Sequence, residues 1–350
     1  MKFEVRKYPE MSWSLSRHKT MLTCQRKYAY DYYVSHNGWL NDADTLARQA
    51  YRLKKITNLE MHFGSVIHDL IYQIIQRVLS NKEIPSEEAV VDEIRHQLNR
   101  SFIESTRKEH LWQHRPKHYT MLHEIYYSQT AQLPDHKIKK ITNRIHTTVS
   151  NFFASRSFAD VLNKEEMHFL ESEKFRYMTV SGVKIYIVMD LLYKDVIKDK
   201  WVIVDWKTGK SSEEDRNQLA LYALYLQQKH NIESLDDIVI RNEYLLEGIH
   251  VEHQLTEQDL VNVQRLYGIS LEQMQSLLID AEENIPKPIE QFPMQEKPAY
   301  LRPLQLSGVM LPFSLMFKTI MNRIHIRWIQ LSYLKGVCVS YESISCRSEW

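Results

Sequence analysis

The chain has 350 residues, 43% of them hydrophobic and 25% charged, a balance that excludes a disordered protein and suits one large α/β domain with a helical elaboration. Its formal net charge of +1 excludes a protein that is basic overall, so any contact with nucleic acid would have to come from a local patch. Three cysteines are too few for a disulfide framework, which indicates a reducing compartment, and we expect a soluble cytoplasmic protein.

Residues 13–33 have the composition of a helix with serine caps. Cations and aromatic rings are interleaved along this segment, which contains Arg17, His18, Lys19, Arg26, Lys27, Trp13, Tyr28, Tyr30, Tyr32 and Tyr33. Cations beside stacking surfaces are typical of proteins that bind single-stranded nucleic acid. The same residues also fit an exposed helix face beside a core aromatic stripe, so both interpretations stay open.

A polar connection is expected over residues 47–59, followed by an amphipathic helix that carries His68. The apolar stripe of this helix comprises Ile67, Leu70, Ile71, Ile74, Ile75 and Val78. A histidine that flanks such a stripe is more often a satisfied core residue than a ligand. The role of His68 therefore depends on the residues that the fold brings to it.

Three further helices are predicted over residues 87–106, 119–132 and 137–154, and together they form an insertion without a motif. The string Pro134-Asp135-His136-Lys137 falls between them, in a polar run that has no strand before it and no second acidic strand beside it. We therefore expect no catalytic role for Asp135 or Lys137.

Two apolar strands, residues 183–193 and 201–207, flank a polar connection and predict a β-hairpin. Asp190 lies on the first strand and Asp205-Trp206-Lys207 on the second, where alternation places Asp205 and Lys207 on one face and Trp206 on the other. Paired carboxylates suit Mg²⁺ or Mn²⁺, and a nearby lysine can hold an attacking water. The alternative is a cross-strand ion pair on a solvated hairpin.

A helix over residues 216–226 places Gln218 and Tyr222 on one face, four residues apart. Their amide and hydroxyl groups could bind a phosphate oxygen or Lys207, although Tyr222 could also be a core aromatic residue. Strands over residues 169–177 and 237–246 complete the expected sheet. A last helix is predicted from residue 256 to about residue 281, with Pro286 and Pro288 ending it.

The end of the chain, residues 301–350, differs in composition from the rest, because it contains no aspartate and has no clear helix or strand boundaries. It fits an appended helix pair, a partner-binding segment or the product of a reading-frame change. Its longest apolar run, residues 309–317, is too short to span a membrane, and the start of the chain lacks the apolar core of a secretory signal.

His68, Asp190, Asp205-x-Lys207 and Gln218-x-x-x-Tyr222, in this order, resemble the RecB-like branch of the PD-(D/E)xK nuclease superfamily. The serine-rich opening from Ser12 and the run Cys24-Gln25-Arg26-Lys27-Tyr28 resemble the same branch, so the resemblance covers residues 12–294. It implies a restriction-endonuclease-like core, in which a mixed central β-sheet is flanked by helices. The expected parts are an N-terminal helical part (1–68), a helical insertion (69–165), the catalytic core (166–295) and an atypical tail (296–350).

The resemblance also implies the role of each residue. His68, Asp190 and Asp205 would bind Mg²⁺ or Mn²⁺, Lys207 would assist the nucleophilic water, and Gln218 and Tyr222 would support the site and the nucleic acid. The expected activity is hydrolysis of DNA, single-stranded or at duplex ends, by exonuclease or endonuclease action in repair or recombination. The sequence has no phosphate-binding Gly-x-x-x-x-Gly-Lys-Ser/Thr loop, so a helicase would be a separate partner.

Some relatives, such as the AddB-type and CRISPR-adaptation exonucleases, hold a 4Fe–4S cluster with one amino-terminal cysteine and three near the carboxyl end. Cys24 matches the first position, but only Cys338 and Cys346 follow it, and three thiolates cannot supply four ligands. We therefore expect no cluster and a buried Cys24. Two alternatives to a nuclease remain, namely an inactive nucleic-acid-binding module and a scaffold subunit with the same fold.

Overall fold

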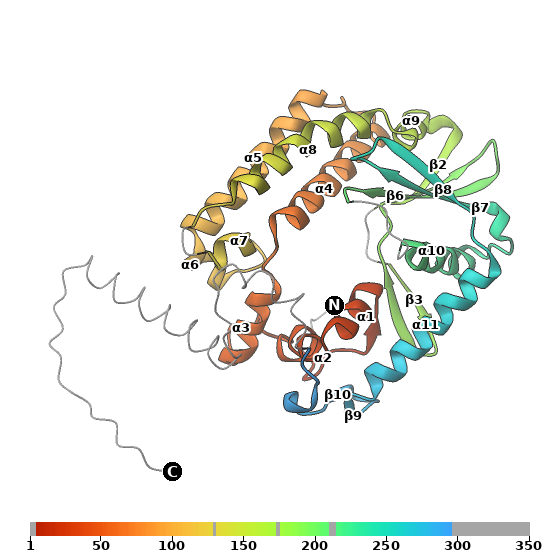
Figure 1. The fold of residues 1–350 in the computed structure, drawn as a ribbon. Coiled ribbons are helices and arrows are strands. Elements are labelled where there is room, and N and C mark those ends of the chain that lie inside the picture. The colour runs from red at the N-terminus through yellow and green to blue at the C-terminus, as the bar shows by residue number, and fades with distance from the viewer. Residues whose placement is uncertain (1–4, 129–130, 173–175, 210–214, 296–350) are drawn as a thin grey trace, which may run out of the picture. The chain divides into compact units, whose positions relative to one another are not determined.

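A mixed five-stranded sheet organises the part of the chain that the computed structural model describes, which is residues 5–128, 131–172, 176–209 and 215–295 (Figure 1). Its strands, in spatial order, are β2 (Met167–Ser172), β5 (Leu191–Asp195), β6 (Lys200–Lys207), β7 (Ile238–Tyr244) and β8 (Ile249–His253). β5 and β6 form the predicted antiparallel hairpin. β7 is parallel to β6, and α10 (Asp215–His230) connects the two strands. The expected mixed sheet flanked by helices is confirmed.

Each face of this sheet is covered by its own set of helices and its own hydrophobic core. Ile203 of β6 belongs to the core that includes α10 and α11 (Glu257–Gln275). Val202 and Val204 belong to the other core, which includes α4 (Leu59–Leu79) and α8 (Asp135–Phe153). The strand therefore alternates between two buried environments, and a polar side chain on it is surrounded by apolar packing.

The second core is made largely by the helices that precede the sheet in the chain. α4 and α8 pack with α5 (Glu87–Arg107) and α9 (Arg156–Leu162), and the predicted apolar stripe of α4 is buried throughout. Where a helix over 119–132 was predicted, the described residues 119–128 and 131–132 contain the short α7 (His123–Tyr126), and α6 (Glu109–His114) precedes it. Among the described residues, no helix combines the length and the apolar composition that crossing a membrane requires.

The Pro134-Asp135-His136-Lys137 string is structural, because it forms the cap and first turn of α8 rather than the end of a strand. Lys137 forms ion pairs with Glu60 and Glu124, which join α8 to α4 and α7. The string therefore has an ordinary packing role.

The amino-terminal region is more divided than predicted. In place of one helix over 13–33, the chain forms β1 (Ser12–Trp13), α1 (Leu15–Thr23), α2 (Gln25–Ala29) and the π-helix η1 (Tyr30–Val34). Cys24, with extended backbone, separates α1 from α2 and caps the second of them. The predicted polar connection over 47–59 was also wrong, because α3 (Thr45–Lys54) begins there with Asp44 as its cap.

The predicted strand over 183–193 is broken in two, and this break positions the candidate site. Its first half is β4 (Val183–Ile187), which pairs with β1 and with β3 (Arg176–Val180) in a separate sheet. Its second half is β5 of the large sheet, so Asp190 lies at the bend between the two sheets. The predicted strand over 169–177 is likewise divided between β2 and β3.

The described residues end in a small hairpin. α11 stops at Gln275, earlier than predicted, and β9 (Leu278–Asp280) and β10 (Ile285–Pro286) follow it. Short 3₁₀ turns occur at Lys164–Glu166, Leu235–Asp237 and Ile289–Gln291. The expectations for residues 301–350, Cys338 and Cys346 included, lie outside the described residues.

A buried polar network joins α9 to the sheet. Arg241 of β7 is 3% exposed, and it donates to Asp160 Oδ2 at 2.7 Å and to Glu252 Oε1 at 2.9 and 3.0 Å. Tyr193 donates to the same Asp160 oxygen at 2.6 Å. Burial raises the pKa of Asp160, but the bonds from Tyr193 and Arg241 outweigh this effect and hold the pKa below its usual value of 3.8.

Replacing Arg241 with methionine is expected to lower the free energy of unfolding by about 3 kcal/mol, because Asp160 would lose its buried counter-charge and keep only the half-exposed Arg156 at 3.3 Å. Urea unfolding measures this difference. Arg95→Met is the matched control, since the Arg95–Asp92 pair is exposed on both sides and its loss should cost less than about 1 kcal/mol. Equal effects of the two substitutions would contradict a supporting role for the buried network.

Candidate active site

β6 presents Asp205 and Lys207 on one face of the sheet, as the alternation predicts. Trp206 lies on the opposite face, packed against Phe152 with ring centroids 6.0 Å apart. The Asp205 and Lys207 side chains are only 7% and 19% exposed, and they form an ion pair with each other. The alternative of a solvated ion pair on an exposed hairpin is therefore wrong, since this pair is held in a largely dry environment.

Asp190 joins the sheet to α4. Its Oδ2 accepts the backbone N–H of Trp206 at 2.7 Å, and its Oδ1 lies 3.1 Å from Nδ1 of His68. Gly64 of the same helix lies close to the end of β6, where a Cβ atom would lie 3.0 Å from the Thr208 hydroxyl. Residues more than one hundred positions apart in the chain thus meet at the end of the hairpin.

A chain of hydrogen bonds continues from Lys207 into α10. The Lys207 ammonium donates to Gln218 Oε1 at 3.1 Å, and the Gln218 amide donates to the Tyr222 hydroxyl. That hydroxyl donates to the carbonyl of Val188 at 2.7 Å and lies 3.4 Å from Asp205 Oδ1. Tyr222 is both a core residue, as one interpretation had it, and a partner of the charged pair.

The charged pair is electrostatically strained. Burial, and then the neighbouring Asp190 carboxylate, raise the pKa of Asp205 to about 6, while Lys207 opposes the shift. Burial also raises the pKa of Tyr222 well above its usual value. Asp205 Oδ2 is buried, and among the described residues no donor meets it with hydrogen-bond geometry, although the Lys207 ammonium lies close by. The Lys207 ammonium is thus the counter-charge of this buried carboxylate.

The residue types at this place fit a hard divalent cation. Asp190 and Asp205 supply carboxylate oxygens, and His68 supplies an imidazole nitrogen, all from neighbouring elements. Within the described parts of the chain, no three such side chains are gathered into a group that could hold a metal ion. In the structure His68 and Asp190 bond to one another, and Asp205 pairs with Lys207. The kinds of donor atom present therefore fit a metal site, although the side chains are not arranged around an ion.

A family model for the PD-(D/E)XK nuclease superfamily matches residues 12–287, which is most of the chain. The chain belongs to the PD-(D/E)XK nuclease superfamily. A search of curated proteins found no match. The family match spans His68, the acidic hairpin and α10, which carry the site residues predicted from the sequence, and these residues lie close to one another in the fold.

A cleft of about 610 Å³ opens beside these candidate site residues, with Val188, Gln218 and Tyr222 among the residues that line it. Most of the other walls come from the amino-terminal region, including Arg17 of α1 and Lys54 of α3. Lys54 was not among the predicted site residues, because the pattern of residues 47–59 was interpreted as a polar connection. An aspartate cap at Asp44 followed by helix-forming residues was the signal available for α3.

The amino-terminal cations divide into two groups. Arg17 and His18 are buried, so neither lies on the exposed helix face that one interpretation required, whereas Lys19 and Lys27 are exposed. His18 Nδ1 lies 2.8 Å from Ser270 Oγ of α11, which makes it a packing residue. The interpretation of this segment as a cationic surface therefore holds for Lys19 and Lys27 but not for Arg17 and His18.

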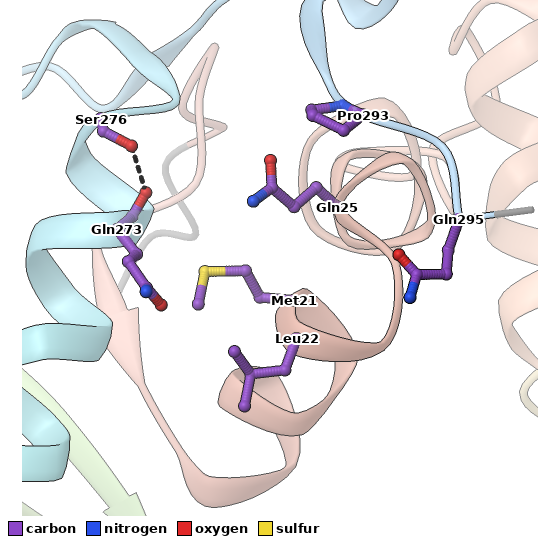
Figure 2. Close-up of a pocket in the computed structure, with 7 residues that line it drawn as sticks. All are labelled: Met21, Leu22, Gln25, Gln273, Ser276, Pro293 and Gln295. Carbon is purple, nitrogen blue, oxygen red and sulfur yellow. Dashed lines mark hydrogen bonds between the residues drawn. The ribbon is translucent and has the colours of Figure 1, made fainter. Parts of the chain in front are cut away.

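Cys24 is half-buried rather than fully buried as expected. Its thiol is free, and Sγ accepts the backbone N–H of Lys27 at 3.4 Å as the cap of α2. Near it, a smaller pocket of about 200 Å³ lies between the amino-terminal helices, the end of α11 and the last described residues (Figure 2). None of the side chains that line it is ionisable: they are Met21, Leu22, Gln25, Gln273, Ser276, Pro293 and Gln295. This pocket offers no acid–base group.

Tyr222→Phe is expected to lower the free energy of unfolding by about 1–3 kcal/mol, because the Gln218 amide and the Val188 carbonyl would lose their partner. Chemical unfolding of the full chain measures this loss. Tyr177→Phe is the control, since that ring is exposed on β3 and its change should stay within about 0.5 kcal/mol. A Tyr222→Phe protein as stable as the native one would refute the hydrogen-bond chain.

Proposed function

We propose that this chain is a metal-dependent deoxyribonuclease that hydrolyses phosphodiester bonds. The observation that carries the proposal is the buried Asp205–Lys207 pair, held between Asp190 on one side and Gln218 on the other. Membership of the nuclease superfamily supports hydrolysis of a nucleic acid. The kind of metal and the choice of DNA are parts of the proposal.

Asp190 and Asp205, with His68 beside them, would hold Mg²⁺ or Mn²⁺. Such a cation, when bound, makes a coordinated water more acidic and offsets the charge that builds up on the phosphate oxygens. Lys207 orients the attacking water through its ammonium group. Gln218 fixes the position of that ammonium, and Tyr222 fixes Gln218, so the lysine is aligned before the substrate arrives.

Finer features of the proposal rest on the resemblance. We assign the chain to the RecB-like branch, with a role in DNA repair or recombination and a separate helicase as partner. We also divide it into the parts 1–68, 69–165, 166–295 and 296–350. α4 runs through the first boundary, so His68 belongs to a helix that the first two parts share.

Labelled DNA incubated with Mn²⁺ or Mg²⁺ is expected to be cleaved by the native chain. Asp205→Asn and Lys207→Ala should each reduce the rate at least about a hundredfold, because one removes a metal ligand and the other the group that orients the water. Single-stranded and duplex substrates are tested in parallel. Chelation of the metal with EDTA should stop cleavage.

The matched controls for these two variants are Asp135→Asn and Lys139→Ala, which change exposed residues on α8 and should cleave at the native rate. Equal rates in all five proteins would identify a contaminating nuclease. If the native protein cuts neither substrate, the inactive binding module expected as the alternative would replace the present proposal.

Mn²⁺ added without DNA is expected to raise the thermal unfolding temperature of the native chain. At a concentration one hundred times its dissociation constant, a ligand that binds only the folded state stabilises it by about 2.7 kcal/mol. Asp205→Asn should lose this shift and Asp135→Asn should keep it. A shift of the same size in both variants would place the metal somewhere other than Asp205.

A further inference from the structure

The cleft beside the motif has cationic walls. Two carboxylates are among the side chains that line it in the described part of the chain, Glu10 and Asp31. Both are engaged elsewhere, because Glu10 forms an ion pair with Lys184 at 2.9 Å and Asp31 forms one with Lys27. Asp31 also lies near Lys54, whose ammonium donates to the Asp31 carbonyl, so cations outnumber the carboxylates along the described walls of the cleft.

Arg17 is the most informative of these cations. It is 4% exposed, and its guanidinium donates to the hydroxyls of Ser12 at 2.9 Å and of Tyr28 at 3.1 Å. Both acceptors are neutral, and Nε of Arg17 has no hydrogen-bond partner among the described residues. A buried guanidinium is normally paired with an anion, so its charge at the wall of a cleft points to an anionic ligand.

Lys54, the last residue of α3, and Lys55, its C-cap, add positive charge to the same wall of the cleft. Lys54 Nζ lies 4.4 Å from the centroid of the Tyr32 ring, and Arg17 Cζ lies 4.5 Å from the same centroid. Burial lowers the pKa of Lys54, Asp31 opposes this, and the neighbouring cations Lys55 and Arg17 lower it further. Cations that crowd each other in this way gain stability when a polyanion enters between them.

Aromatic rings are exposed within the same cleft. Trp39 is 39% exposed and Tyr186 of β4 is 37% exposed, and both line the cleft together with Arg17 and Lys54. A Trp or Tyr ring in contact with solvent offers a face on which a nucleic-acid base can stack. Cations and exposed rings in one cleft are the combination that binds a phosphate backbone and unpaired bases at once.

The geometry points to this cleft as the binding track for single-stranded DNA. The phosphates contact Arg17, Lys54 and Lys55, the bases stack on Trp39 and Tyr186, and the strand continues to Gln218 beside Lys207. The inference rests on the proposed nuclease function and adds the substrate class to it. A duplex does not fit these contacts, because its base faces are covered by their neighbours and cannot stack on protein rings.

Fluorescence anisotropy in EDTA, with the full chain and a labelled oligonucleotide, measures binding without turnover. The single strand should bind at least about tenfold more tightly than a blunt duplex of the same sequence. Trp39→Ala and Tyr186→Ala should each weaken binding of the single strand about tenfold, and Trp39→Phe should restore it. The Phe variant shows that a stacking face, rather than the packing of Trp39, is what the strand needs.

Salt dependence tests the cationic wall. Lys54→Gln should reduce the slope of log K against log salt concentration by about 0.7, the value for one phosphate contact on a single strand. Lys139→Gln, an exposed lysine on α8, should leave the slope unchanged. An unchanged slope for Lys54→Gln would show that Lys54 of α3 does not contact a phosphate of the bound strand.

Equal affinity for single strand and duplex, tighter binding of single-stranded RNA, or native affinity in Trp39→Ala and Tyr186→Ala would overturn the inference. These outcomes are separate from failure of the proposed function. If the protein binds single strands through the cleft but never cleaves them, only the proposed nuclease activity is refuted. If it cleaves DNA and the two aromatic variants bind as the native protein does, only the proposed binding track is refuted.

Discussion

The candidate site depends on one constraint, which is that β6 ends with a carboxylate and an ammonium buried between two apolar cores. Removing ions from water costs several kcal/mol for each, and the attraction between them returns little more than that cost. Asp205 and Lys207 therefore contribute little to the stability of the sheet by themselves. Their presence on a strand that is otherwise packed with Ile203 and Val204 is explained by chemistry at this place.

The rest of the fold holds that pair in position from both faces. On one face, α10 supplies Gln218 and Tyr222, which bond to Lys207 and to one another. On the other face, α4 lies close to the end of β6 at Gly64, and the same helix brings His68 to Asp190. Because Asp190 also accepts the N–H of Trp206, one carboxylate connects the helix on one side to the strand that carries the charged pair.

The sequence was sufficient to predict the features that depend on residue spacing within one strand or one helix. The period-two pattern of the hairpin predicted that Asp205 and Lys207 share a face, and the four-residue spacing placed Gln218 with Tyr222. The sequence could not predict that the strand breaks before Asp190, since the apolar run from residue 183 continues without glycine or proline. That break comes from tertiary pairing: the first half of the run pairs with β1 and β3, and the second with β2 and β6. The cleft was beyond prediction for the same reason, because its walls come from segments far apart in the chain.

Gln218 links the cleft to the charged pair, because it lines the cleft and also accepts a hydrogen bond from Lys207. A strand seated against Arg17 and Lys54 would carry its phosphates toward the amide that aligns the lysine. The guanidinium of Arg17, whose hydrogen bonds in the described part of the chain go to neutral hydroxyls, would then be paired with a phosphate. The same strand would lie beside the buried Asp205–Lys207 pair, because Gln218 contacts both the cleft and the lysine. Neither the guanidinium nor the ion pair is explained by the stability of the folded chain alone, which agrees with the proposed role of this region in binding and cutting a phosphate backbone.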